Sequence, residues 1–304
     1  MKISTKTLYD NIMTNLNRAS TDMIRANEVV STGKKINRAS DDPMALMLVL
    51  DVRSSMANID QLERNITAGR LWITVGESSL NQVDEFLYQA KAVCVDIKDG
   101  DKTELELNKA ADAVDEYLKQ ILSLANAKVG NSYIFAGTKT DTKPFFLDES
   151  DPNLVKVNYN GNDSPFSVKV GIDTDVAVGR NGEEVFGVFG KNWEDDNIFK
   201  TLIDVKQYIM DDNKDEIEMS IEKIESHIKA VRSVISDATV KIVQFNIREK
   251  IIKDLDLAYD NKRSLLEDAD INEAVVNLKI KELAYQAALS SSASVMDLSI
   301  MNYL

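Results

Sequence analysis

Residues 217–266 have the sequence IEMSIEKIESHIKAVRSVISDATVKIVQFNIREKIIKDLDLAYDNKRSLL, in which apolar side chains recur at every seventh position. Steps of seven reach Ile217, Ile224, Val231, Ala238, Phe245, Ile252, Tyr259 and Leu266, and a second row contains Ile221, Ile228, Ile235 and Ile242. This spacing puts both rows on one side of an α-helix and predicts left-handed packing against a partner helix. The helix would be roughly 75 Å long at about 1.5 Å per residue, and in isolation its apolar stripe would stay in water.

A matching repeat lies between residues 52 and 97. Its first row contains Val52, Ile59, Ile66, Ile73, Leu80, Leu87 and Cys94, and its second row contains Leu62, Gly69, Gly76, Val83, Ala90 and Ile97. Because the two repeats are similar in length, each is the expected partner of the other. The predicted intrachain seam consists of Ile59, Ile66, Ile73, Leu80 and Leu87 on one helix and Ile224, Val231, Phe245 and Ile252 on the other.

Glycine and proline divide the chain into three segments. Of 12 glycines and 4 prolines, eight and three respectively fall between Gly130 and Gly190, and neither residue type follows Gly190. Both residue types interrupt helices, so their distribution predicts a helical arm, a turn-rich insert and a second helical arm. Within the insert, residues 133–137, 154–159 and 166–170 are predicted strands, and Asn160-Gly161 favours a hairpin between the second and the third.

The expected fold class is therefore mainly α, with a long antiparallel, coiled-coil-like bundle formed by the two arms and a small β-rich insert. We expect three domains: a terminal helical assembly domain of residues 1–43 with 268–304, a long-helix rod of residues 44–133 with 196–267, and an outward insert of residues 134–195.

The sequence STGKKINRASDDP, residues 31–43, predicts a structured joint between two helices. Glycine at 33 suits a helix stop, and aspartate at 42 followed by proline at 43 suits an N-cap with proline in the first helical position. The residues expected to form this joint are Gly33, Asn37, Arg38, Asp41, Asp42 and Pro43.

Both ends of the chain are predicted to be helices that contact neighbouring chains. The expected interface residues are Leu8, Ile12, Leu16, Met23 and Val30 near the N-terminus, and Val275, Leu278, Leu289, Val295 and Leu298 near the C-terminus. From Leu283 onward the only charged side chain is Asp297, and serines at 290–292 and 294 permit close helix contact. The polar residues in this stretch disfavour a membrane span, so we expect no membrane insertion.

The composition argues against several classes of function. With 36 basic and 50 acidic residues the net charge is −14, which would repel a nucleic acid. Cys94 and His227 are the only cysteine and histidine, so we expect no catalytic site, no cofactor and no metal site. Cys94 is interpreted as a buried residue of the seam and His227 as a solvated helix residue. The first twenty residues lack the apolar run of a secretory signal, so export is expected without a cleavable signal peptide.

Residues 31–43 resemble the joint shared by bacterial flagellins and hook–filament junction proteins, the hook-associated protein 3 family. LEDADI at 266–271 and MNYL at 301–304 resemble the same superfamily. GNSYIFAGTKT at 130–140, followed by Pro144-Phe145, is more similar to the junction proteins than to the flagellins.

This resemblance implies a structural subunit of the bacterial flagellum at the hook–filament junction, outside the cell. It implies export through the flagellar type III pathway and assembly through the terminal helices. The implied partners are like subunits in a ring, flagellin, a neighbouring hook-associated protein and an export chaperone at the C-terminal helix. A flagellin that forms the filament itself is the alternative, and an enzyme or ligand-binding domain on the insert is a third hypothesis.

Overall fold

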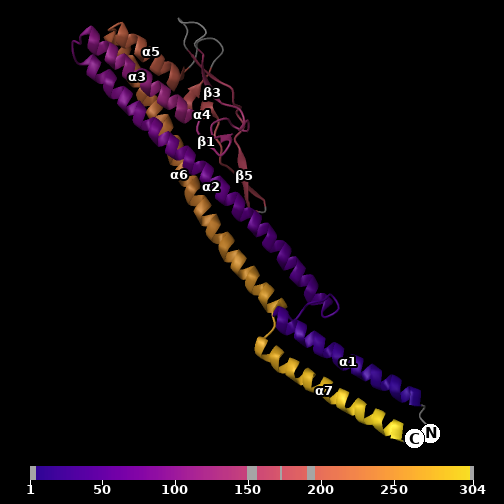
Figure 1. Ribbon diagram of the computed structural model, residues 1–304. Coiled ribbons are helices and arrows are strands. Elements are labelled where there is room, and N and C mark those ends of the chain that lie inside the picture. Colours follow the sequence, from indigo (N-terminus) through magenta and orange to yellow (C-terminus); the bar gives the residue numbers. More distant parts are fainter. Residues whose placement is uncertain (1–4, 149–155, 172, 190–195, 302–304) are drawn as a thin grey trace. The chain divides into compact units, whose positions relative to one another are not determined.

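The computed structural model describes residues 5–148, 156–171, 173–189 and 196–301, and within them most of the chain is helical (Figure 1). The helices are α1 (Thr5–Thr32), α2 (Pro43–Lys98), α3 (Glu104–Ala125), the short α4 (Gly182–Phe186), α5 (Ile198–Met210), α6 (Lys214–Glu267) and α7 (Ile271–Met301). They form two compact units, Met1–Ile59 with Asp254–Leu304, and Asp60–Lys253. The predicted division into three domains is not tested by these units and stays a prediction.

In the second unit α2 and α6 lie side by side and antiparallel (Figure 1). Of the residues predicted for the seam, those in this unit are all buried, none more than 6% exposed: Ile66, Ile73, Leu80 and Leu87 on α2, and Ile224, Val231, Phe245 and Ile252 on α6. Ile59, in the first unit, is also 6% exposed. Heptad spacing keeps such residues on one side of each helix. On that side the partner helix covers them. The expected fold class, a mainly α antiparallel bundle with a small β insert, is confirmed.

A row of polar pairs, here called the polar ladder, runs beside this seam. Its members are Glu77–Thr239 (3.0 Å), Asp84–Arg232 (2.8 Å), Lys91–Glu225 (2.5 Å) and Lys98–Glu218 (2.6 Å). Each step of seven residues forward on α2 is matched by a step of seven backward on α6. Exposed pairs of this kind add little to stability, but charges beside an apolar seam set the register and direction of the two helices.

Phe245 explains why a glycine lies in the middle of α2. A Cβ atom built on Gly69 would lie 2.6 Å from the Phe245 ring and 3.2 Å from Val178. Glycine weakens a helix by roughly 1 kcal/mol relative to alanine. At this position the missing side chain makes room for a fully buried aromatic ring of α6.

At one end of the second unit α3 and α5 complete the bundle (Figure 1). Lys206 of α5 donates to Asp115 of α3 at 2.6 Å, and Thr103 and Glu106 form a capping box at the start of α3. α5 and α6 are separate helices because the chain turns at residues 211–213, where Asp212 has a φ of +48°. That turn contains neither glycine nor proline, so the distribution of these residues gives no sign of it.

The insert forms antiparallel strand pairs rather than one sheet. The pairs are β1 (Lys128–Val129) with β2 (Ser132–Tyr133), β3 (Phe145–Asp148) with β4 (Lys156–Tyr159), β5 (Ser167–Gly171) with β6 (Thr174–Ala177), and β7 (Gly187–Val188) with β8 (Asp196–Asn197). The predicted hairpin at Asn160-Gly161 is wrong, because β4 pairs with the preceding β3 and β5 pairs with β6. A cluster of fully buried rings, Phe135, Phe145, Phe186 and Phe199, ties the insert to α5.

We expect Ile224→Asp to destabilise the second unit by about 3 kcal/mol or more, because it buries a carboxylate in the seam without a partner. Thermal unfolding followed by circular dichroism measures the change. Met219→Asp is the matched control, since Met219 is an apolar residue of the same helix that is 50% exposed. Equal melting temperatures for the two variants would contradict the seam.

Candidate assembly interface

The joint predicted at residues 31–43 is held to the end of α6 by backbone hydrogen bonds. α1 ends at Thr32 and is followed by Gly33, whose φ of +71° is a conformation that favours glycine. The Lys35 N–H donates to the Glu267 carbonyl at 2.8 Å, and the Ala269 N–H donates to the Gly33 carbonyl at 2.9 Å. Two linkers far apart in sequence, between α1 and α2 and between α6 and α7, thus form a single structure.

Glu267 is the charged centre of this joint. Its side chain is 4% exposed, and its Oε1 atom accepts from Lys34 Nζ and from Arg53 Nη2, both at 2.5 Å. Burial alone would raise the pKa of Glu267. The hydrogen bonds and charges of Lys34 and Arg53 outweigh that effect and hold the pKa below its usual value. Glu267 therefore stays ionised. From the end of α6 it pairs with Lys34, which follows α1, and with Arg53 of α2.

The other joint residues order the chain between α1 and α2. One Asp41 oxygen accepts from the N–H groups of Asn37 (3.1 Å) and Arg38 (2.8 Å), while Arg38 pairs with Glu28 at 2.9 Å. Asp42 Oδ1 accepts from Ala45 N–H at 2.9 Å and so caps α2, which begins at Pro43. Asn37, Arg38, Asp41 and Asp42 of the predicted joint thus make local contacts in this linker. The role of the six joint residues stays a prediction.

α1 and α7 pack against each other as an antiparallel pair (Figure 1). Lys281 of α7 pairs with Asp22 of α1 at 3.2 Å, and the buried Ala26 and Ala274 allow close approach. Among the residues predicted for assembly, five are half-buried: Ile12, Leu16, Met23, Val30 and Leu278. The intrachain helix pair therefore uses part of the stripe that we expected neighbouring chains to cover.

Apolar side chains that the pair does not cover remain on both helices. Val275 (48%) and Leu289 (42%), both predicted interface residues, are exposed. The side chains of Leu8, Val295 and Leu298 lie outside the described residues. Further exposed apolar residues, absent from the sequence prediction, are Tyr9, Met13, Ile24, Ile271, Val276, Ile280 and Leu283. The role of these helices in assembly stays a prediction, but two helices alone leave apolar surface of the kind that marks interaction sites.

The single cysteine and the single histidine both lie in the second unit. Cys94 is fully buried in the seam, and burial raises the pKa of its thiol to about 12. The interpretation of His227 as solvated is wrong: its side chain is 11% exposed, and its Nε2 lies 3.0 Å from Thr201 Oγ1. Burial lowers the pKa of His227, although the charge of Asp196 opposes this.

Among the described residues, no cluster of three or more histidine, cysteine or acidic side chains is arranged to hold a metal ion. Within the same part of the chain, no helix has both the length and the apolar character needed to cross a bilayer.

Glu267→Gln removes the charge that both cations of the joint share, and we expect it to weaken the joint by about 1–2 kcal/mol. Hydrogen exchange at the Lys35 and Ala269 amides should accelerate roughly 5- to 30-fold, because both amides donate across the joint. Glu273→Gln, at an exposed position of α7, is the control. Unchanged exchange in Glu267→Gln would show that the ion pairs do not hold the joint.

The same site predicts a pH dependence. Since the pKa of Glu267 is lowered in the folded chain, its contribution is complete above the pKa of the unfolded chain and is lost as the pH falls through the folded value. Protection of the Lys35 and Ala269 amides should therefore fall more steeply with acid in the unsubstituted chain than in Glu267→Gln. Parallel pH profiles would contradict this assignment.

Comparisons with known proteins agree with this architecture. The family model for the bacterial flagellin N-terminal helical region matches residues 3–140. Flagellar hook-associated protein 3 of Salmonella typhimurium is 23% identical over 319 residues, covering 99% of this chain and 98% of that protein. Phase 1 flagellin of Salmonella naestved is 25% identical over 161 residues, covering 53% of this chain and 29% of the flagellin.

A likeness in structure supports the fold. The crystal structure of the flagellar junction protein from Legionella pneumophila superimposes with a TM-score of 0.59 at 16% identity, covering 72% of this chain and 100% of that one. The chain is therefore similar to flagellar hook-associated protein 3 over nearly its whole length, and its residues 3–140 are similar to the N-terminal helical region of bacterial flagellins.

Proposed function

We propose that this chain is a structural subunit of the bacterial flagellum that joins the hook to the filament. The observation that carries the proposal is the exposed apolar surface of α1 and α7 in a chain that resembles hook-associated protein 3 from end to end. Such surface costs free energy in water, at about 25 cal/mol per Å², and burial between subunits recovers it. The proposed partners are like subunits in a ring, flagellin and a neighbouring hook-associated protein.

Export and handling before assembly belong to the same proposal. The subunit would leave the cell through the flagellar type III pathway and act outside the cell. An export chaperone would cover α7, whose exposed apolar residues include Val276, Ile280 and Leu283. A chaperone that binds this helix would prevent premature association of the same surface.

A flagellin is the alternative, favoured by the match of residues 3–140 to the flagellin model. The lengths favour the junction role. This chain spans 29% of the flagellin it matches but 98% of hook-associated protein 3. The resemblance to structural flagellar proteins is also consistent with a chain that has no enzymatic activity.

The decisive experiment is a deletion strain. Without a junction subunit, cells should retain hooks but release flagellin into the medium, and the unsubstituted chain should restore attached filaments. Electron microscopy of hooks and immunoblotting of the medium measure both effects. If cells lacking the chain still export all other flagellar subunits and bear attached filaments, the junction role is wrong. If this chain itself is the bulk protein of the filament, the flagellin alternative holds.

Limited proteolysis of the purified monomer offers a second test. We expect early removal of residues 1–43 and 268–304, with slower cleavage between residues 44 and 266, because the two terminal helices bury few large side chains. Mass spectrometry identifies the products. Termini that resist cleavage in a proven monomer would count against assembly through α1 and α7.

A further inference from the structure

The chain contains two asparagines that are followed by glycine, Asn160-Gly161 and Asn181-Gly182. Asparagine is among the residues that decay chemically in proteins. The decay is fastest before glycine, which has no side chain to shield its backbone nitrogen and which leaves the backbone free to turn. It requires a free asparagine side chain and a free N–H group on the next residue. The fold gives the two pairs different surroundings.

The first pair has both reacting groups free. Asn160 is exposed and follows the end of β4, where its own N–H donates to the Pro144 carbonyl at 2.8 Å. Within the described part of the chain, the side-chain amide of Asn160 makes no hydrogen bond, and the N–H of Gly161 makes none either. The amide carbon of Asn160 and the nitrogen that can attack it thus belong to adjacent residues, and no contact holds either of them back.

The second pair has both groups occupied. The Oδ1 atom of Asn181 accepts from the Glu184 N–H at 2.6 Å as the N-cap of α4, and its Nδ2 atom donates to the Asp163 carbonyl at 3.4 Å. Gly182 is buried, and its N–H donates to the Tyr159 hydroxyl at 2.9 Å. Reaction at Asn181 would first have to break the cap and the bond to Tyr159.

Packing around Tyr159 explains why both pairs end in glycine. A Cβ atom on Gly161 would collide with the Tyr159 ring, and one on Gly182 would collide with the same ring and with Phe145. Tyr159 packs on Phe145 at 5.1 Å between ring centroids, and its hydroxyl donates to the Phe135 carbonyl at 3.2 Å. A larger residue at 161 would shield the nitrogen, but it does not fit beside this ring.

We propose that Asn160 is a site of spontaneous modification, at which water converts the asparagine into aspartate and isoaspartate, while the fold protects Asn181. The nitrogen of Gly161 bonds to Cγ of Asn160, the Cγ–Nδ2 bond breaks, and ammonia leaves with the proton from that nitrogen. Water then opens the resulting succinimide at either carbonyl. Opening at the main-chain carbonyl gives isoaspartate. The modification does not depend on the proposed function.

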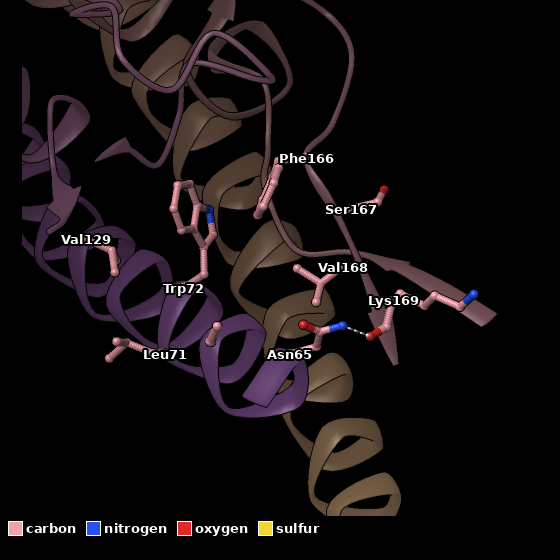
Figure 2. Close-up of a pocket in the computed structure, with 9 residues that line it drawn as sticks. Asn65, Leu71, Trp72, Val129, Phe166, Ser167, Val168 and Lys169 are labelled. Atoms are coloured by element: carbon pink, nitrogen blue, oxygen red, sulfur yellow. Dashed lines mark hydrogen bonds between the residues drawn. The ribbon is translucent and has the colours of Figure 1, made fainter. Parts of the chain in front are cut away.

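Isoaspartate carries the main chain through the former side chain, so it lengthens the backbone by one carbon. The segment after Asn160 is fixed at both ends. At one end is Tyr159. At the other, Phe166 packs on Trp72 of α2 at 5.2 Å between ring centroids (Figure 2), and its carbonyl accepts from the N–H of Val178 at 2.9 Å. The added carbon therefore displaces the residues between these two anchors.

Asn162 is the residue between the anchors whose contacts report this displacement. Its Oδ1 atom accepts from the Thr138 N–H at 2.8 Å, and its Nδ2 atom donates to Thr138 Oγ1 at 2.6 Å. Its own N–H donates to the Ala136 carbonyl at 3.3 Å. We expect isoaspartate at 160 to loosen the hold of this turn on residues 136–138, and to leave the seam between α2 and α6 unchanged.

A comparison of the two pairs in one sample tests the proposal. The folded full-length chain and the same chain in guanidinium chloride are kept in mildly alkaline buffer, because the attacking nitrogen must lose its proton. Peptide mapping by mass spectrometry locates deamidation and distinguishes isoaspartate from aspartate. In denaturant both pairs should react at similar rates. In the folded chain Asn181 should react at least about tenfold more slowly than Asn160, because at least one hydrogen bond of ordinary strength must open first.

Comparable rates at the two sites in the folded chain, including no reaction at either, would overturn the proposal. So would faster reaction at Asn181.

Asn160→Gln is the matched control, since glutamine closes the corresponding larger ring far less readily and the side chain is exposed. After equal incubation, hydrogen exchange at the Thr138 amide should become several-fold faster in the unsubstituted chain and stay unchanged in Asn160→Gln. Unchanged exchange in a chain whose Asn160 has become isoaspartate would show that the turn absorbs the added carbon, and would overturn the structural consequence.

Discussion

The apolar seam between α2 and α6 is the constraint on which the rest of the second unit depends. A helix of 54 or 56 residues with one continuous apolar side is stable only when that side is covered. The covering helix comes from the other end of the sequence, so the chain must turn back, and the insert with α3 and α5 occupies that return. The polar ladder then selects one direction and one register among the alignments that heptads alone would permit.

The two units use helix pairs in different ways. In the second unit large residues such as Phe245, Leu87 and Ile66 are fully buried, and a glycine is placed where a ring needs space. In the first unit the α1–α7 pair buries Ala26 and Ala274 and leaves valine, isoleucine and leucine side chains in water. The first arrangement can be complete in one chain. The second is the arrangement expected of a surface that gains its cover from other molecules.

The sequence predicted features that depend on periodicity and missed features that depend on which segments meet. Heptad rows predicted the antiparallel packing of the two long helices, because every seventh residue must face a partner helix. The turn between α5 and α6 was not predicted, because Asp212 adopts a positive φ without glycine. The hairpin prediction failed since Asn160-Gly161 is a local signal, whereas the partner of β4 is the earlier β3. Glu267 could not be recognised among 50 acidic residues, because only the fold brings Lys34 and Arg53 to it.

The pairing of distant segments has a consequence for the order of folding. Lys98 and Glu218, which form the last pair of the ladder, are 120 positions apart, and Arg53 and Glu267 are 214 apart. A nascent chain that ends before residue 217 has every apolar row of α2 without its covering helix. The long arms therefore cannot reach their final structure during synthesis of the first two-thirds of the protein. The seam can form only after residues 217–266 have been made, and contacts between residues so far apart in sequence are slow to form.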